Sequence, residues 1–167
     1  MSTPTIDSGI RDNYVRGTVA DFLKVNIGDD SRLAVMSAFF TLHAYAALKG
    51  WLDRIDHMDF LFGDPKFVGS LDPDRTEAKA FIIDSTGLSL ANVLHQKRVA
   101  RECAEWIRGK VDIKSIKQSG FLHGKMFHIA NGPVEHAIVG SSNFTIRGLG
   151  LSVGIGNIEL NLVQRHP

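Results

Sequence analysis

The sequence contains little cysteine, no excess of one charge sign and no long apolar segment. Its 167 residues include a single cysteine, Cys103, so no intrachain disulfide can form, which fits a reducing compartment. The longest mostly apolar stretch, residues 33–48, is interrupted by Ser37, Thr41 and His43 and falls short of the roughly 20 residues that span a bilayer. The first ten residues lack the basic start and apolar block of a secretion signal. We therefore expect a soluble, cytoplasmic protein.

The composition is that of one globular domain. Hydrophobic residues make up 44% of the chain and charged residues 22%, and a chain of 167 residues buries about two thirds of its unfolded surface. Residues 1–12 are polar, and we expect them to be disordered, with a single domain over residues 13–167. The chain stops directly after an apolar segment, which indicates a fragment of a longer protein.

Charge is unevenly distributed although the net charge is only +1. Residues 1–90 hold nine basic and 13 acidic side chains, a net charge of −4. Residues 91–167 hold ten basic and five acidic side chains, a net charge of +5. A basic half suits a polyanionic partner such as nucleic acid.

Apolar periodicity predicts helices that alternate with strands. Residues 65–88 carry Gly and Pro without a sustained period, and we interpret them as a variable insertion. Strand, helix and strand in succession indicate parallel pairing, so we predict an α/β fold, an α-β-α sandwich with a mixed, largely parallel central sheet. The expected helices cover residues 15–25, 42–55 (with Thr41 as the cap) and 90–108, and the expected strands cover 33–40, 58–62, 111–116, 121–129, 137–139 and 158–163.

The stretch from Phe121 to Leu149 carries the chemistry. It begins with a strand that contains His123 and Lys125, turns at residues 131–133, and continues through a second strand into the loop 140–143, which we expect to open a short helix. Residues two apart on a strand face the same side, so the imidazole and the ammonium should converge. Unpaired backbone N–H groups at the following helix start would favour an anion such as a phosphate.

A second histidine and lysine pair with the same spacing serves as a comparison. His95 and Lys97 fall in a predicted helix, where residues two apart lie roughly 200° apart around the axis. Their side chains should diverge, and we expect no site there.

The pattern His123-x-Lys125 followed by Gly140-Ser141-x-Asn143 resembles the phospholipase D superfamily, whose signature is HxK, an Asp five residues later, and GSxN. The Asp position is Ala130 here. The resemblance implies that His123 attacks a phosphodiester to form a phosphohistidine, while Lys125 and Asn143 stabilise the phosphoryl charge without a metal or other cofactor. Glu159 matches a carboxylate of the nuclease members. We therefore expect it to orient the His123 ring.

Three further residues are predicted to shape the site or contact the substrate: Ser141, Ser142 and Arg147. Simpler roles remain open for most members of the site. Lys125 could be a solvated strand lysine, Ser141 a turn residue, Asn143 a helix N-cap, Glu159 an edge-strand charge and Arg147 a surface residue. His128 and His136 flank the hairpin without Cys or acidic residues at ligand spacing, so no metal site is predicted.

Two functions follow from the sequence. The first is a metal-independent phosphodiesterase, in particular a nuclease, with lipid hydrolysis less favoured because no amphipathic membrane segment is evident. The second is a non-catalytic nucleic-acid-binding module. The segments HGK and GSSNFT followed by RGLG resemble the amino-terminal domain of some bacterial helicase-like proteins, which implies a helicase domain in the same parent chain. Family members bring two motifs together, so a chain with one motif is expected to form a homodimer that shares one active site.

Overall fold

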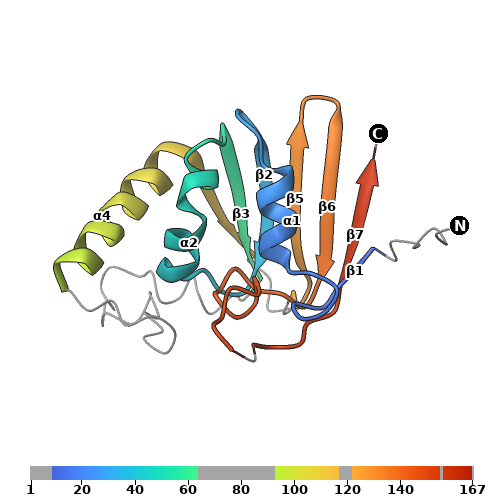
Figure 1. Ribbon diagram of the computed structural model, residues 1–167. Helices are drawn as coiled ribbons and strands as arrows, with labels where there is room; N and C mark the ends of the chain where they lie inside the picture. Colours follow the sequence, from blue (N-terminus) through green and yellow to red (C-terminus); the bar gives the residue numbers. More distant parts are fainter. Residues whose placement is uncertain (1–8, 64–92, 117–121, 155, 167) are drawn as a thin grey trace, which may run out of the picture.

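The computed structural model describes residues 9–63, 93–116, 122–154 and 156–166, which Figure 1 shows as a sheet with associated helices. None of the described helices combines the length and the apolar character that crossing a bilayer requires. The elements, in chain order, are β1 (Ile10–Arg11), α1 (Val19–Asn26), β2 (Arg32–Ser37), α2 (Leu42–Leu52), β3 (His57–Phe62), α4 (Val93–Lys110), β4 (Val111–Ser115), β5 (Lys125–Asn131), β6 (Val134–Gly140) and β7 (Asn161–His166).

The described strands form one seven-stranded sheet in the order β1-β7-β6-β5-β2-β3-β4. Strands β2, β3 and β4 run parallel, whereas the other four neighbouring pairs are antiparallel. The α/β class and the mixed sheet are therefore confirmed, but the expectation of a largely parallel sheet is wrong. Parallel order arises where a helix carries the chain back across the sheet, whereas the predicted turn, at Gly132-Pro133, reverses β5 directly into β6.

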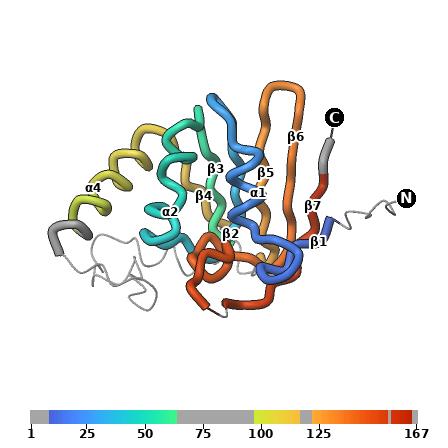
Figure 2. Tube along the Cα trace, viewed as in Figure 1, coloured from blue at the N-terminus to red at the C-terminus, as the bar shows by residue number. Residues whose placement is uncertain are grey.

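The described helices pack against one face of the sheet, as Figures 1 and 2 show for α1 and α2. The indole of Trp106 in α4 donates to the carbonyl of Leu52 in α2 at 3.0 Å and joins α4 to the same layer. Helices on both faces were predicted, but among the described residues one face alone is covered. Alternate strand positions supply the sheet side of this single core: Leu33 and Val35 of β2, Met58, Phe60 and Phe62 of β3, and Phe127 and Ile129 of β5.

Polar caps set the starts of the first two helices. The predicted cap Thr41 accepts a hydrogen bond from the backbone N–H of Ala44 at 3.4 Å, so α2 begins where the sequence indicated. Thr18 and Asp21 form a capping box that starts α1 at Val19 instead of the predicted residue 15. The residues before Val19 that were predicted to be helical are held outside the helix. The carboxylate of Asp12 accepts hydrogen bonds from the backbone N–H groups of Tyr14 and Arg16.

The expectation of a disordered amino terminus is wrong for residues 10 and 11. Residues 1–8 lie outside the described residues, but Ile10 and Arg11, which were expected to be disordered, pair with Leu162 and Asn161 as strand β1. The predicted insertion at 65–88 lies outside the described residues. Strands β3 and β4 match their predicted ranges to within one residue at each end, whereas β7 begins three residues later than predicted.

Candidate active site

The antiparallel register of β5 and β6 brings the two halves of the sequence motif together. Lys125, the first residue of β5, pairs with Gly140, the last residue of β6. The segment that precedes Lys125 and the loop that follows Gly140 therefore meet at one end of the sheet. A Cβ at Gly140 would collide with the backbone oxygen of Leu160, so glycine allows the segment before β7 to approach this loop.

His123 lies outside the strand that was predicted to hold it. Residues 122–124 are irregular and are anchored by a hydrogen bond from the N–H of Leu122 to the carbonyl of Gly63, at 3.1 Å. His123 is exposed, whereas Lys125 is buried, so the expectation that both side chains project from one strand face is wrong. They are joined differently, because the Lys125 ammonium donates to the backbone oxygen of His123 at 2.6 Å.

Lys125 is 4% exposed, which is unusual for a lysine side chain. Burial lowers the pKa of its ammonium, and the Glu159 carboxylate opposes this shift. The alternative of a solvated strand lysine is therefore excluded. A buried ammonium is costly unless charge or hydrogen bonds compensate it, and such groups concentrate at functional sites.

Glu159 joins the site through Ser141. The Ser141 hydroxyl donates to one carboxylate oxygen of Glu159, and the Asn157 amide lies 3.4 Å from the other. The same hydroxyl accepts from the N–H of Leu160 at 3.1 Å, so Ser141 fixes the segment that carries the carboxylate. The orientation of the His123 ring by Glu159 stays a prediction.

Asn143 connects the loop to the end of strand β2. Its side-chain oxygen accepts from the N–H of Ala38 at 3.0 Å and from the hydroxyl of Ser37 at 3.2 Å. This pairing identifies the inward end of the amide as the oxygen, so the NH₂ group is the end that could donate to an anion. Residues 145–150 form successive turns, so the predicted helix is wrong and Asn143 is not its N-cap.

Ser142 does not occupy the position expected of a substrate-binding residue. It is fully buried, and its hydroxyl accepts from the side-chain amide of Asn161 at 3.0 Å. The same Asn161 side chain also contacts the backbone of Arg11 at 3.3 Å. Substrate contact by Ser142 is therefore not supported, and its role is to hold the loop to β7 and β1. Arg147 is exposed in the turn region, and its contact with substrate stays a prediction.

Two supporting residues were missed at the level of sequence. Ser37 and Asn161 are buried polar residues at strand ends that bind the motif loop. Ser37 contacts Asn143 and Phe144 of the loop. Asn161 contacts Ser142. A polar residue inside a buried apolar run is the signal that could have identified both.

The position of the missing motif Asp lies away from this site. Ala130 is the sixth residue of β5 and pairs with Arg32 and Glu135, near the end of the strand opposite Lys125. Five residues of extended strand separate the two positions by about 17 Å. A carboxylate at position 130 would therefore not reach the Lys125 ammonium, and its absence removes no charge from the group of residues described above.

Comparison of the chain with protein-family models and with curated proteins found no match in either case.

Proposed function

We propose that this chain is a metal-independent phosphodiesterase of the phospholipase D type that cleaves nucleic acid. The observation that carries the proposal is the buried Lys125 ammonium, held against the backbone of the exposed His123 at the end of the sheet where the GSSN loop lies. A nucleophile beside a preformed positive charge suits attack on a phosphodiester, because the phosphoryl oxygens gain charge as the reaction proceeds.

The proposed reaction has two steps. A ring nitrogen of His123 attacks phosphorus, the bond to the leaving oxygen breaks, and a phosphohistidine forms while a general acid protonates the leaving alcohol. Water then attacks phosphorus, releases the phosphate monoester and restores the imidazole. Lys125 and the NH₂ group of Asn143 would stabilise the phosphoryl oxygens in both steps. Glu159, positioned by Ser141, would favour the productive form of the ring.

The described residues that we assign to the site contribute one exposed histidine, whereas the reaction needs both a nucleophile and a general acid. We propose that a second copy of the chain supplies the second imidazole. In such a homodimer, the two His123 side chains would face one phosphodiester across a two-fold axis, and each would take one role. No metal or other cofactor has a role in this scheme.

A non-catalytic nucleic-acid-binding module of a larger helicase-like protein is the second candidate. Its supporting observation is that the Lys125 ammonium already donates to the His123 carbonyl and is 4% exposed, so it would have to leave this partner before it could stabilise a reacting phosphoryl group. The basic balance of residues 91–167 serves either function equally well. The two candidates differ in whether a covalent intermediate forms.

The test is a cleavage assay in excess EDTA with plasmid DNA, single-stranded DNA and RNA oligonucleotides, and bis(p-nitrophenyl) phosphate. The nuclease proposal predicts cleavage under chelation and an acid-labile, base-stable phosphoprotein when the reaction with a radiolabelled substrate is quenched. Binding of nucleic acid with neither cleavage nor labelling would instead support the binding module. Cleavage that requires added magnesium or zinc would overturn the metal-independent mechanism.

A further inference from the structure

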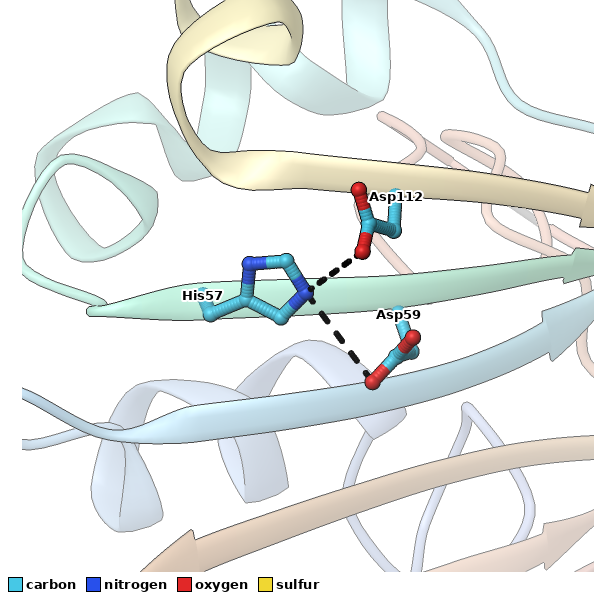
Figure 3. A group of neighbouring side chains, drawn as sticks. All are labelled: His57, Asp59 and Asp112. Carbon is cyan, nitrogen blue, oxygen red and sulfur yellow. Dashed lines mark ion pairs between the residues drawn. The ribbon is translucent and has the colours of Figure 1, made fainter.

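A second group of chemically active side chains lies on the other half of the sheet, at its parallel edge. His57 and Asp59 are two residues apart on β3, so they share a face, and Asp112 lies opposite Asp59 in the parallel register with β4. Figure 3 shows the His57 ring directed toward both carboxylates. The buried residues of β3 are Met58, Phe60 and Phe62, so this trio occupies the face that no described helix covers.

The donor atoms lie close enough together for one ion to bind all three after the side chains rotate. The Nε2 atom of His57 lies 3.6 Å from an oxygen of Asp112 and 4.0 Å from an oxygen of Asp59. One donor atom from each of the three residues falls within 4.8 Å of the other two. Ligands at about 2.1 Å from a tetrahedral ion lie roughly 3.4 Å apart, so the carboxylate oxygens would have to move by up to about 1.4 Å, which rotation of the two aspartate side chains can supply.

The Asp59 carboxylate is held in an orientation that suits a metal ligand. Its Oδ1 atom accepts from the Lys114 ammonium at 2.7 Å, which leaves Oδ2 on the side of His57. An outer hydrogen bond that fixes a coordinating carboxylate is a regular feature of metal sites.

We propose that His57, Asp59 and Asp112 bind one divalent transition-metal ion, with zinc as the best fit. One imidazole and two carboxylates form a mixed nitrogen and oxygen donor set, whereas magnesium and calcium prefer oxygen ligands alone. Three protein ligands leave a fourth tetrahedral position for water. Because the ligands come from β3 and from the edge strand β4, the ion would fasten that edge to the sheet.

The proposed metal site is separate from the proposed active site. His57 begins β3, whereas Gly63, directly after the end of β3, contacts the segment that leads to His123. The two sites therefore lie at opposite ends of this strand, and binding of the ion does not depend on phosphodiesterase activity. The sequence predicts no metal site around His128 and His136, and the pairing of Asp59 with Asp112 is visible only in the sheet register.

The test is titration of untagged, EDTA-treated and dialysed protein with zinc chloride, followed by isothermal calorimetry. Wild type should bind one equivalent at this site, and His57→Ala and Asp112→Asn should each weaken that binding at least tenfold. His128→Ala is the matched control, because His128 is also a strand histidine but contacts one carboxylate, Glu135 at 3.3 Å. It should bind as wild type does.

Two further measurements decide the structural role. Zinc should raise the melting temperature of wild type and of His128→Ala but not of His57→Ala, with circular dichroism confirming that each variant is folded. Magnesium at the same concentration should have no such effect. Absence of zinc binding at micromolar concentrations, or equal binding by wild type and His57→Ala, would overturn the proposal and leave His57 as an ion-pair partner only.

Discussion

The ammonium of Lys125 donates to the backbone oxygen of His123 at 2.6 Å, so the side chain of one motif residue positions the main chain of the other. This relationship differs from the parallel projection of two side chains that an HxK pattern suggests. It allows the ammonium to be buried while the imidazole stays exposed at the same end of the sheet.

Replacement of Lys125 by methionine should abolish activity without loss of stability. Methionine fills the same buried space and removes a charge that is costly to bury, so the free energy of unfolding should stay within about 1 kcal/mol of wild type or increase. Loss of charge stabilisation should lower the cleavage rate at least about 100-fold. Urea denaturation and the EDTA assay measure the two effects. Lys49→Met, which removes a half-buried lysine paired with Asp53, is the control and should retain activity.

The pKa of Lys125 also predicts how stability depends on pH. Burial lowers this pKa below its usual value of 10.5, so the folded protein releases the proton at lower pH than the unfolded chain does. Below the folded pKa the cost of the buried charge is fully present. As the pH rises through the folded pKa toward 10.5, that cost is lost, so wild type should gain stability relative to Lys125→Met. Urea denaturation of both proteins from pH 7 to 10.5 measures this difference, and a constant or falling difference would contradict the shift.

His123→Asn should eliminate cleavage while the protein still folds and binds nucleic acid. The exposed position should tolerate asparagine, which is polar and of similar size. Asparagine offers no ring nitrogen for attack on phosphorus. The matched control is His95→Asn, because the second HxK pattern lies within helix α4, as predicted. Its rate should be unchanged. A rate for His123→Asn within threefold of wild type would reject His123 as the nucleophile.

Truncation of Asn161, the partner of Ser142, should lower stability, whereas truncation of Ser141 should lower activity with little effect on stability. Asn161→Ala removes two contacts with buried Ser142 and one with Arg11, so it should reduce the free energy of unfolding by about 1–3 kcal/mol. Ser141→Ala affects an exposed residue and should change stability by less than about 0.5 kcal/mol. It should still lower activity, because it removes the group that fixes Glu159. Equal stability losses in the two variants would contradict this division.

The helix cap and the hairpin turn that depend on a few neighbouring residues could be predicted from the sequence. Thr41 was identified as a cap, and the turn between β5 and β6 was placed correctly, because both depend on the chemistry of a few consecutive residues. The burial of Lys125, the inward orientation of Ser142 and the contacts of Ser37 and Asn161 were not predicted. These depend on residues up to 150 positions apart, whose proximity is determined by strand register. The antiparallel pairing of β5 with β2 was missed for the same reason, because no local pattern specifies which strand becomes a neighbour.

The last prediction tests whether two chains share one active site. The described residues that we assign to the site provide one exposed histidine, and a single imidazole cannot be nucleophile and leaving-group acid at once in the first step. Dimers that carry two different affinity tags can be purified with one wild-type subunit and one His123→Asn subunit. A shared site should leave these mixed dimers with only a small fraction of wild-type activity, because the one site of the dimer lacks one of its two imidazoles. Independent sites would leave about half, and a monomer that cleaves at the full rate would also exclude the shared arrangement. Dimers that carry the two tags on wild-type subunits serve as the control and should retain full activity.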